Sequence, residues 1–232
     1  MRLTVLLFML FTASSWAEKP LRIAVAANFK PTLEHINQQL HDKTGIDITL
    51  SSASTGVLAT QIEHGAPFDL FFAADRAAPL KIMAQQKQHH RNVFCYALGK
   101  LALVGGHGSL SALAQPNLSI AIANPATAPY GKAAMEVLAR PEFKAGKNRK
   151  LVRGANTSQA HAFWYSGAVD LALLPQSIAP ATATPIPQRW HQPIAQYAIS
   201  LTSNSKVDTY LNWIRSDTVR AQITAAGYEP CP

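Results

Sequence analysis

Short apolar segments of strand type alternate with segments of helix type along nearly the whole chain. The apolar runs occupy residues 21–27, 46–50, 69–75, 94–106, 118–125, 150–154, 169–175 and 194–202. Most are followed by apolar side chains at helical spacing, as in the stretch from Phe29 to Leu40. This alternation is typical of α/β proteins, in which helices cover a largely parallel sheet. The sequence therefore predicts an α/β fold, with residues 94–106 as one long strand that passes between two parts of the molecule.

Four strand-to-helix junctions share one composition. They read "AAN" (26–28), "SASTG" (52–56), "ATAPYG" (126–131) and "ANTSQ" (155–159), with small, hydroxyl, amide and Tyr residues and no charged side chain. Ser, Thr and Asn are also preferred helix N-caps, so any one junction is explained by capping alone. A helix N-terminus, however, leaves about four N–H groups unpaired and favours anions. Because ligands of open α/β sheets bind at the carboxyl ends of the strands, the four junctions together predict an anion site.

The chemistry of these junctions narrows the class of anion. A tetrahedral dianion needs about seven or eight hydrogen bonds, and charge-assisted bonds of roughly 1.5–3 kcal/mol each can offset its desolvation. One side-chain donor and one main-chain N–H from each junction reach that number. A protonated anion such as hydrogen phosphate would also require an acceptor. The lack of carboxylates at these junctions therefore favours sulfate, molybdate or tungstate.

Other classes of function find less support in the sequence. Asp69 and Asp75 lie at the two ends of one strand, ~20 Å apart, which is too far for paired acid and base catalysis. Ser54 has no nucleophile-elbow motif, and His161 lies on an apolar helix without a second ligand at metal-binding spacing. The formal net charge is +8, but no Lys/Arg block is interleaved with aromatic residues. We therefore expect no enzyme activity, no cofactor, no side-chain metal ligand and no nucleic-acid partner.

The chain begins with a stretch that is typical of a secretory signal peptide. Residues 1–17 contain one basic residue, an apolar core and a small-x-small ending at Ala17. The apolar core is about half the ~20 residues that a membrane span requires. Export to an oxidising compartment also favours a disulfide between Cys95 and Cys231, the two cysteines of the chain. We thus expect a periplasmic protein with one disulfide.

Several of these segments resemble the periplasmic molybdate-binding proteins of ABC importers, a group of class II solute-binding proteins. The resemblance rests on "IAVAANF", "SSASTGVLATQIEHGAPFDLFFAAD", "YALGKLAL", "IAIANPATAPYG", "ANTSQAHAFWYSGAVDLALLP" and "AAGYEP", in family order over nearly the whole mature chain. It implies a monomeric two-lobed periplasmic-binding-protein fold, with a mostly parallel sheet flanked by helices in each lobe and the ligand in the cleft between them. The implied lobes are residues 18–98 plus 195–232, and residues 99–194.

The resemblance also implies binding residues. The matching positions are Asn28, Thr55, Tyr130 and Thr157, with Ala27, Ser54 and Asn156 as weaker candidates. Thr157 is expected to donate its main-chain N–H, and Asn28 its side-chain amide. Some members donate a Tyr hydroxyl where this chain has Pro175, which has no N–H, so we interpret Tyr130 as the compensating donor.

The implied function is capture of molybdate, and also tungstate, for delivery to a membrane permease. A receptor for sulfate or another tetrahedral oxyanion is the alternative within this class. A hydrolase or transferase acting on anionic esters, and a sensor that reports oxyanion levels to a partner, are the rivals from other classes.

Overall fold

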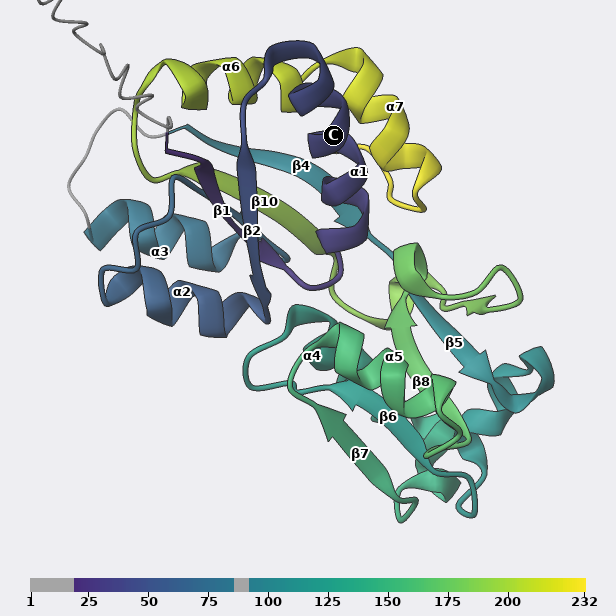
Figure 1. Cartoon of the computed structure of the whole chain (residues 1–232). Coiled ribbons are helices and arrows are strands. Elements are labelled where there is room, and N and C mark those ends of the chain that lie inside the picture. The colour runs from purple at the N-terminus through teal and green to yellow at the C-terminus, as the bar shows by residue number, and fades with distance from the viewer. Residues whose placement is uncertain (1–18, 86–91) are drawn as a thin grey trace, which may run out of the picture.

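The computed structural model describes residues 19–85 and 92–232, and the predicted signal peptide lies outside these ranges. The described chain forms two five-stranded sheets, each covered by helices, with one sheet above the other in Figure 1. We call the first sheet with its helices lobe I and the second sheet with its helices lobe II. Both termini of the described chain belong to lobe I, since β1 and the last helix pack there.

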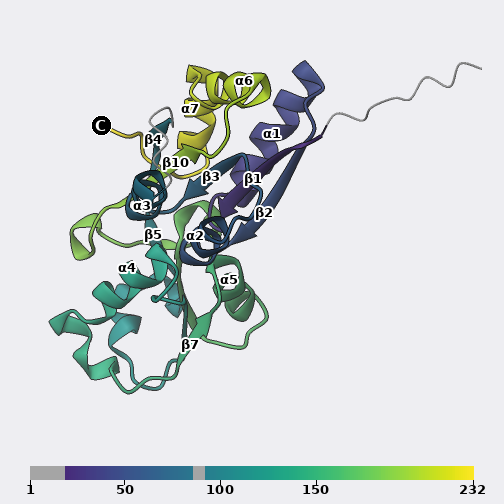
Figure 2. The same ribbon diagram turned by 90° about the vertical axis from the view of Figure 1, so that its left-hand side faces the viewer.

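Lobe I is built on a sheet with the strand order β2-β1-β3-β10-β4. Its strands are β1 (Leu21–Ala26), β2 (Ile48–Ala53), β3 (Leu70–Ala73), β4 (Val93–Gly99) and β10 (Ile194–Ser200). Its helices are α1 (Lys30–Thr44), α2 (Thr55–Glu63), α3 (Ala77–Gln85), α6 (Ser205–Ile214) and α7 (Asp217–Ala225). Helices α1, α6 and α7 cover one face and α2 and α3 the other, as the two separate core clusters and Figures 1 and 2 show.

Lobe II has the strand order β7-β6-β8-β5-β9. Its strands are β5 (Leu101–Gly105), β6 (Ile120–Ala123), β7 (Leu151–Gly154), β8 (Leu171–Pro175) and β9 (Thr184–Pro185). Its helices are α4 (Pro129–Leu138) and α5 (Thr157–Tyr165), which pack on opposite faces. Short 3-10 helices lie at Gly106–Gly108, Leu110–Ala114, Pro141–Gly146, Gln176–Ile178 and Gln188–Trp190.

The predicted α/β fold is confirmed, but neither sheet is mostly parallel. In lobe I, β1 pairs in parallel with β2 and β3, whereas β10 is antiparallel to β3 and β4. Lobe II repeats this arrangement, with β6 parallel to β7 and β8, and β5 antiparallel to β8 and β9. The parallel pairs come from strand–helix–strand units, and the antiparallel pairs involve the strands next to the points where the chain changes lobes.

The prediction of one long strand over residues 94–106 is wrong in one respect. Strand β4 ends at Gly99 in lobe I, and β5 begins at Leu101 in lobe II, so Lys100 alone separates two strands of different sheets. The return crossing precedes Ile194, where β10 enters the lobe I sheet. The division at residues 98/99 and 194/195 stays a prediction.

The aromatic residues at the end of helix α5 differ in burial. Phe163 and Trp164 are partly buried, but Tyr165 is 79% exposed and stacks on His161 at the surface. The helix ends here, and Gly167 follows with a left-handed φ of 73°. Of these three aromatic residues, Phe163 and Trp164 therefore contribute to the edge of the core, and Tyr165 does not.

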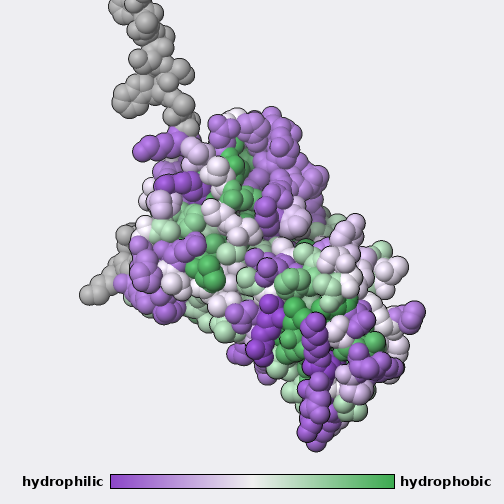
Figure 3. Space-filling view, turned by 60° about the horizontal axis from the view of Figure 1, so that its bottom comes forward, coloured by the Kyte–Doolittle hydropathy of each residue, from purple (hydrophilic) through white to green (hydrophobic). Residues whose placement is uncertain are grey.

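Hydrophobic residues lie in separate groups among hydrophilic ones on the molecular face shown in Figure 3. Within the described ranges, no helix is long and apolar enough to cross a membrane.

Cys95 and Cys231 form a disulfide, as the sequence predicted, which ties the end of the chain to β4. Next to this bond, Leu98 and Glu229 exchange two main-chain hydrogen bonds of 2.8 and 2.9 Å.

Candidate functional site

A small buried cavity lies between the two lobes, where the N-termini of α2, α4 and α5 meet the end of β1. It is lined by Ala26, Ala27, Asn28, Ser54, Thr55, Ala74, Ala128, Pro129, Tyr130, Asn156 and Thr157. The structure therefore brings together all seven candidate residues from four separate junctions. The space open to a water-sized molecule is only about 10 Å³, far below the ~300–1,000 Å³ of pockets for drug-sized ligands. This space excludes an organic substrate in the present arrangement of the lobes.

Main-chain N–H groups are the first set of donors at this cavity. Thr55 and Thr157 are the first residues of α2 and α5, and Tyr130 is the second residue of α4. These positions leave N–H groups without a partner inside the helix. Within the described part of the chain, their N–H groups and that of Asn28 have no hydrogen-bond partner. Three helix N-termini thus direct their positive ends at one cavity.

Hydroxyl groups are the second set of donors. Ser54 and Thr157 are each 4% exposed, and among the described residues their oxygens have no hydrogen-bond partner. Ser54 occupies the N-cap of α2 but makes no capping hydrogen bond. The Oγ1 of Thr55 accepts a hydrogen bond of 2.9 Å from the N–H of Ala74, so its own hydrogen remains free to donate. Neither hydroxyl caps α2, so helix capping does not explain why Ser54 and Thr55 occupy these positions.

Tyr130 contributes a fourth hydroxyl to the cavity. Its side chain is 2% exposed, and burial raises its pKa well above the ordinary value of a tyrosine. The phenol therefore keeps its proton at neutral pH and can act as a donor. Its oxygen accepts a hydrogen bond of 3.1 Å from the side-chain amide of Gln196. Since the oxygen accepts from Gln196, the phenolic hydrogen is available to the cavity.

Asn28 lies at the cavity, but its amide has other partners than the sequence suggested. Its Nδ2 donates to Oε1 of Gln196 at 2.8 Å and to the hydroxyl of Tyr228 at 3.3 Å. Both amide hydrogens are therefore engaged within the protein. The group that Asn28 leaves for a ligand is its main-chain N–H.

The two remaining candidates offer less to a ligand. The N–H of Ala27 donates to the carbonyl oxygen of Ala53, and its side chain has no donor. Asn156 caps α5 through a hydrogen bond of 3.0 Å from the N–H of Gln159 to its Oδ1. Pro175, the residue that replaces a tyrosine in the family resemblance, is the last residue of β8 and is not among the residues that line the cavity.

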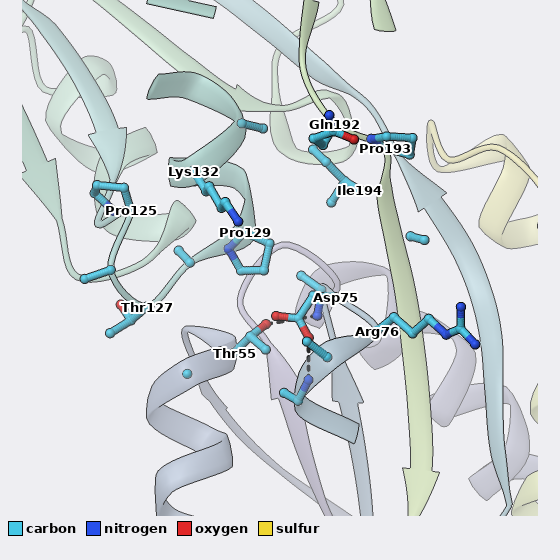
Figure 4. A pocket seen from close by; sticks show the side chains of 18 of the residues that line it. Thr55, Asp75, Arg76, Pro125, Thr127, Pro129, Lys132, Gln192, Pro193 and Ile194 are labelled. Atoms are coloured by element: carbon cyan, nitrogen blue, oxygen red, sulfur yellow. Dashed lines mark hydrogen bonds between the residues drawn. The ribbon is translucent and has the colours of Figure 1, made fainter. Parts of the chain in front are cut away.

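A wider pocket adjoins the cavity and shares Thr55, Ala74, Ala128 and Pro129 with it. In Figure 4, Thr55 and Asp75 lie on one side of this pocket, and Pro129 and Lys132 on the other. Burial raises the pKa of Asp75, whereas hydrogen bonds from two main-chain N–H groups and the charge of Lys132 act in the opposite direction. The charged residues therefore stand outside the cavity, whose own lining holds no carboxylate, Lys or Arg.

The two lobes touch directly beside the cavity. The N–H of Gly56 in α2 donates to the carbonyl oxygen of Thr127 in lobe II at 2.9 Å. The hydroxyl of Ser177 reaches the carbonyl oxygen of Asn28 at 3.3 Å. These contacts hold the two lobes together beside the cavity.

The residues that could suggest catalysis have structural roles. Asp69 accepts hydrogen bonds from the N–H of Arg22 and the hydroxyl of Thr202, and Asp75 caps α3 through the N–H of Ala78. His161 stacks on surface aromatic residues. Across residues 19–85 and 92–232, no group of three His, Cys, Asp or Glu side chains could hold a metal ion.

The sequence interpretation did not include the residues that support the site from behind. Gln196, Tyr96 and Tyr228 are buried, and each lies outside the four junctions. Tyr96 bonds directly to Gln196, whereas Tyr228 is connected to it through Asn28. A polar residue in the apolar run of β10 was the one signal for Gln196, because a buried amide requires partners.

Comparison with known proteins points to one family. Residues 21–229 match the family described as bacterial extracellular solute-binding protein. The chain is 33% identical to the molybdate-binding protein ModA of Azotobacter vinelandii, over 89% of this chain and 88% of that protein. It is 31% identical to ModA of Rhodobacter capsulatus, over 88% of this chain and 86% of that protein.

Solved structures agree with this result. The periplasmic molybdate-binding protein of Azotobacter vinelandii superposes with a TM-score of 0.83 at 32% identity, covering 91% of this chain and all of that one. The sulfate-binding protein SubI of Mycobacterium tuberculosis has a TM-score of 0.73 at 13% identity, covering 92% of this chain and 87% of that one, and shares the fold alone.

Proposed function

The chain belongs to the bacterial extracellular solute-binding proteins, and from that premise we propose that it captures molybdate and delivers it to the permease of an ABC importer. The observation that carries the proposal is the single cavity in which uncharged donors from both lobes converge. The names of its relatives support molybdate as the ligand. Tungstate, which has the same charge and shape, is proposed as a second ligand.

The geometry explains how such an ion could be held without a basic residue. Four hydroxyl groups, from Ser54, Thr55, Tyr130 and Thr157, and four main-chain N–H groups surround one small space. Hydrogen bonds to an ion are roughly twice as strong as neutral ones, and helix N-termini add favourable potential. The proposed binding residues are thus Asn28, Thr55, Tyr130 and Thr157, joined by Ser54.

Lobe closure follows from the placement of these donors. Thr55 and Asn28 belong to lobe I, whereas Tyr130 and Thr157 belong to lobe II. An ion that contacts both sets binds the closed arrangement better than the open one, and it therefore shifts the population toward closure. The permease would then receive a closed, loaded protein.

Selectivity has two physical sources in this proposal. The cavity lining contains no carboxylate to accept a proton, which disfavours hydrogen phosphate relative to a fully deprotonated dianion. Sulfate carries the same charge as molybdate but is smaller, so donors spaced for molybdate would be too far apart to contact it all at once. We propose that size separates these two ions.

We also propose where the protein acts, its oligomeric state and its lack of a cofactor. Residues 1–17 would direct export to the periplasm, where the chain would act as a monomer without a cofactor. The relatives are solute-binding proteins, and we propose that this chain likewise has no enzymatic activity.

Isothermal titration of the purified mature protein with molybdate, tungstate, sulfate and phosphate tests the proposal. We expect one site per chain with micromolar or tighter affinity for molybdate and tungstate, and sulfate at least about tenfold weaker, a difference of ~1.4 kcal/mol. Molybdate binding no tighter than millimolar would reject the proposed function. Sulfate binding as tight as molybdate would assign the protein to the sulfate alternative.

A further inference from the structure

Gln196 is a fully buried polar residue at the return crossing between the lobes. Its side chain is 0% exposed, and most other residues of its strand, β10, are apolar. The pairing of β10 with β4 is irregular between Gln196 and Tyr197. An uncharged amide in such a place requires hydrogen-bond partners, because a buried polar group without them is costly.

The partners of Gln196 come from both lobes. Its Oε1 accepts hydrogen bonds from Nδ2 of Asn28 at 2.8 Å and from the hydroxyl of Tyr96 at 2.9 Å. Its Nε2 donates to the hydroxyl oxygen of Tyr130 at 3.1 Å. Gln196 therefore joins a cavity residue of lobe I to a cavity residue of lobe II from the side opposite the cavity.

These bonds fix the direction of the Tyr130 hydroxyl. The Nε2 of a glutamine can only donate, so the phenolic oxygen must accept and its hydrogen must point elsewhere. The cavity is the space next to it. The amide of Asn28 is likewise held away from the cavity, and this anchors the turn that carries its free main-chain N–H.

Gly99 gives independent support for the hydrogen bond between Gln196 and Tyr130. A Cβ atom at this position would lie 2.1 Å from the hydroxyl oxygen of Tyr130 and 2.6 Å from Nε2 of Gln196. The absence of a side chain at Gly99 thus makes room for the Gln196–Tyr130 hydrogen bond. Gly99 does not have a positive φ, so space and not backbone conformation explains this glycine.

We propose that Gln196 is a positioning residue for the oxyanion: it orients the Tyr130 hydroxyl as an obligate donor and couples it to Asn28 across the lobes. The inference rests on the proposed function, since it assigns a role at the same site. Gln196 does not line the cavity, and it acts through the residues that do.

A double-mutant cycle on molybdate affinity tests this coupling. The variants are Gln196→Met, which keeps the side-chain length without hydrogen bonds, Tyr130→Phe, and both together. We expect Gln196→Met to weaken binding about tenfold and Tyr130→Phe to add less than about twofold in that background, because the hydroxyl has lost its orientation. Gln222→Met is the matched control, since it breaks an amide–amide hydrogen bond of 2.8 Å to Gln39, far from the cavity.

Gly99→Ala provides a second route if Gln196→Met does not fold. We expect the added methyl group to weaken binding about tenfold in the wild-type background. The factor should be smaller with Tyr130→Phe, which removes the 2.1 Å contact with the hydroxyl oxygen and leaves those with Nε2 of Gln196 at 2.6 Å and with the ring carbon Cζ at 2.8 Å. Equal losses of affinity from Gly99→Ala in both backgrounds, or additive losses from Gln196→Met and Tyr130→Phe, would overturn the role of Gln196. The proposed binding of molybdate would still stand. A wild-type protein that binds no oxyanion would overturn this inference together with the proposed function.

Discussion

Thr55 shows how one side chain can serve the fold and the ligand together. Its oxygen accepts from the N–H of Ala74, and its hydrogen remains for the cavity. We expect Thr55→Ala to weaken molybdate binding by about 1–3 kcal/mol, because a charge-assisted hydrogen bond is lost. Titration calorimetry measures this loss. Thr60→Ala is the control, since the hydroxyl of this exposed residue in the same helix donates only to the carbonyl oxygen of Gly56. Equal losses in both variants would contradict the assignment.

The hydroxyl of Thr157 is expected to affect ligand binding and stability in opposite directions. Its hydroxyl is buried, and no described residue accepts or donates a hydrogen bond to it. Thr157→Val keeps the shape and removes an unpaired polar group, a change worth about 1–3 kcal/mol. We expect the free energy of unfolding without ligand to rise and the affinity for molybdate to fall. Urea unfolding and titration measure the two effects, and a variant that loses stability as well would argue that the hydroxyl has a partner.

The buried tyrosines predict a loss of stability at high pH. Burial raises the pKa of Tyr228 from 10.0 to about 12. Below pH ~10 this phenol is protonated in the folded and unfolded states alike, so its contribution is fully present. Between pH ~10 and ~12 the unfolded chain loses the proton first, and the free energy of unfolding falls. Tyr96, Tyr130 and Tyr210 are shifted in the same direction.

Urea unfolding at several pH values from about 8 to 11.5 measures this effect. We expect Tyr228→Phe to have a shallower decline than the wild type. Tyr165→Phe, which changes a residue that is 79% exposed, should leave the slope unchanged. A wild-type stability that stays flat over this range would contradict the prediction.

The N-terminus of α2 is the element that closes the cavity from lobe I. Gly56 donates to Thr127 across the lobes, and a Cβ at Gly56 would lie 3.2 Å from the main chain of Thr127. We expect Gly56→Val to hold the lobes apart, because its larger side chain strikes lobe II. Small-angle scattering should give a larger radius of gyration in the presence of molybdate, and titration an affinity at least about tenfold weaker. Gln61→Val is the control, since it introduces a β-branched residue at an exposed position of the same helix. Closure of Gly56→Val as complete as in the wild type would contradict the role of Gly56.

Local sequence was sufficient to predict most elements and the four cavity junctions. Unpaired N–H groups and small polar side chains at a helix N-terminus are local properties. The choice of Thr55, Tyr130 and Thr157 rested on the family resemblance, but the meeting of the four junctions could be predicted from the α/β pattern alone. The break at Lys100 could not, because the apolar pattern continues unchanged from β4 into β5. Nor did the pattern show that β2 extends through Ser52, the first residue of one junction, and leaves it exposed.

At the scale of the whole molecule, the disulfide is expected to affect stability but not binding. Cys95 and Cys231 are separated by 136 residues, and closing such a loop is worth about 2–4 kcal/mol. Replacing both by Ser should lower the free energy of unfolding by that amount in urea, with molybdate affinity within about twofold because both residues belong to lobe I. Unchanged stability would show that the bond adds nothing to the contacts around Glu229.

The supporting network depends on the whole fold and could not be read from the sequence. Asn28 bonds to Gln196 and Tyr228, which lie 168 and 200 residues further along the chain. The pattern of each segment indicates burial but not which distant side chain completes it. Sequence therefore predicted the groups that line the cavity better than the groups that hold them in place.

A crystal structure of the mature protein grown with molybdate, with anomalous data at the molybdenum absorption edge, tests the central claim most directly. We predict one molybdenum peak between the lobes, with its oxygens within hydrogen-bond distance of Thr55, Tyr130 and Thr157 and no Lys or Arg in contact. A peak outside this cavity, or an ion held by a basic side chain, would contradict the claim that neutral donors from two lobes hold the dianion.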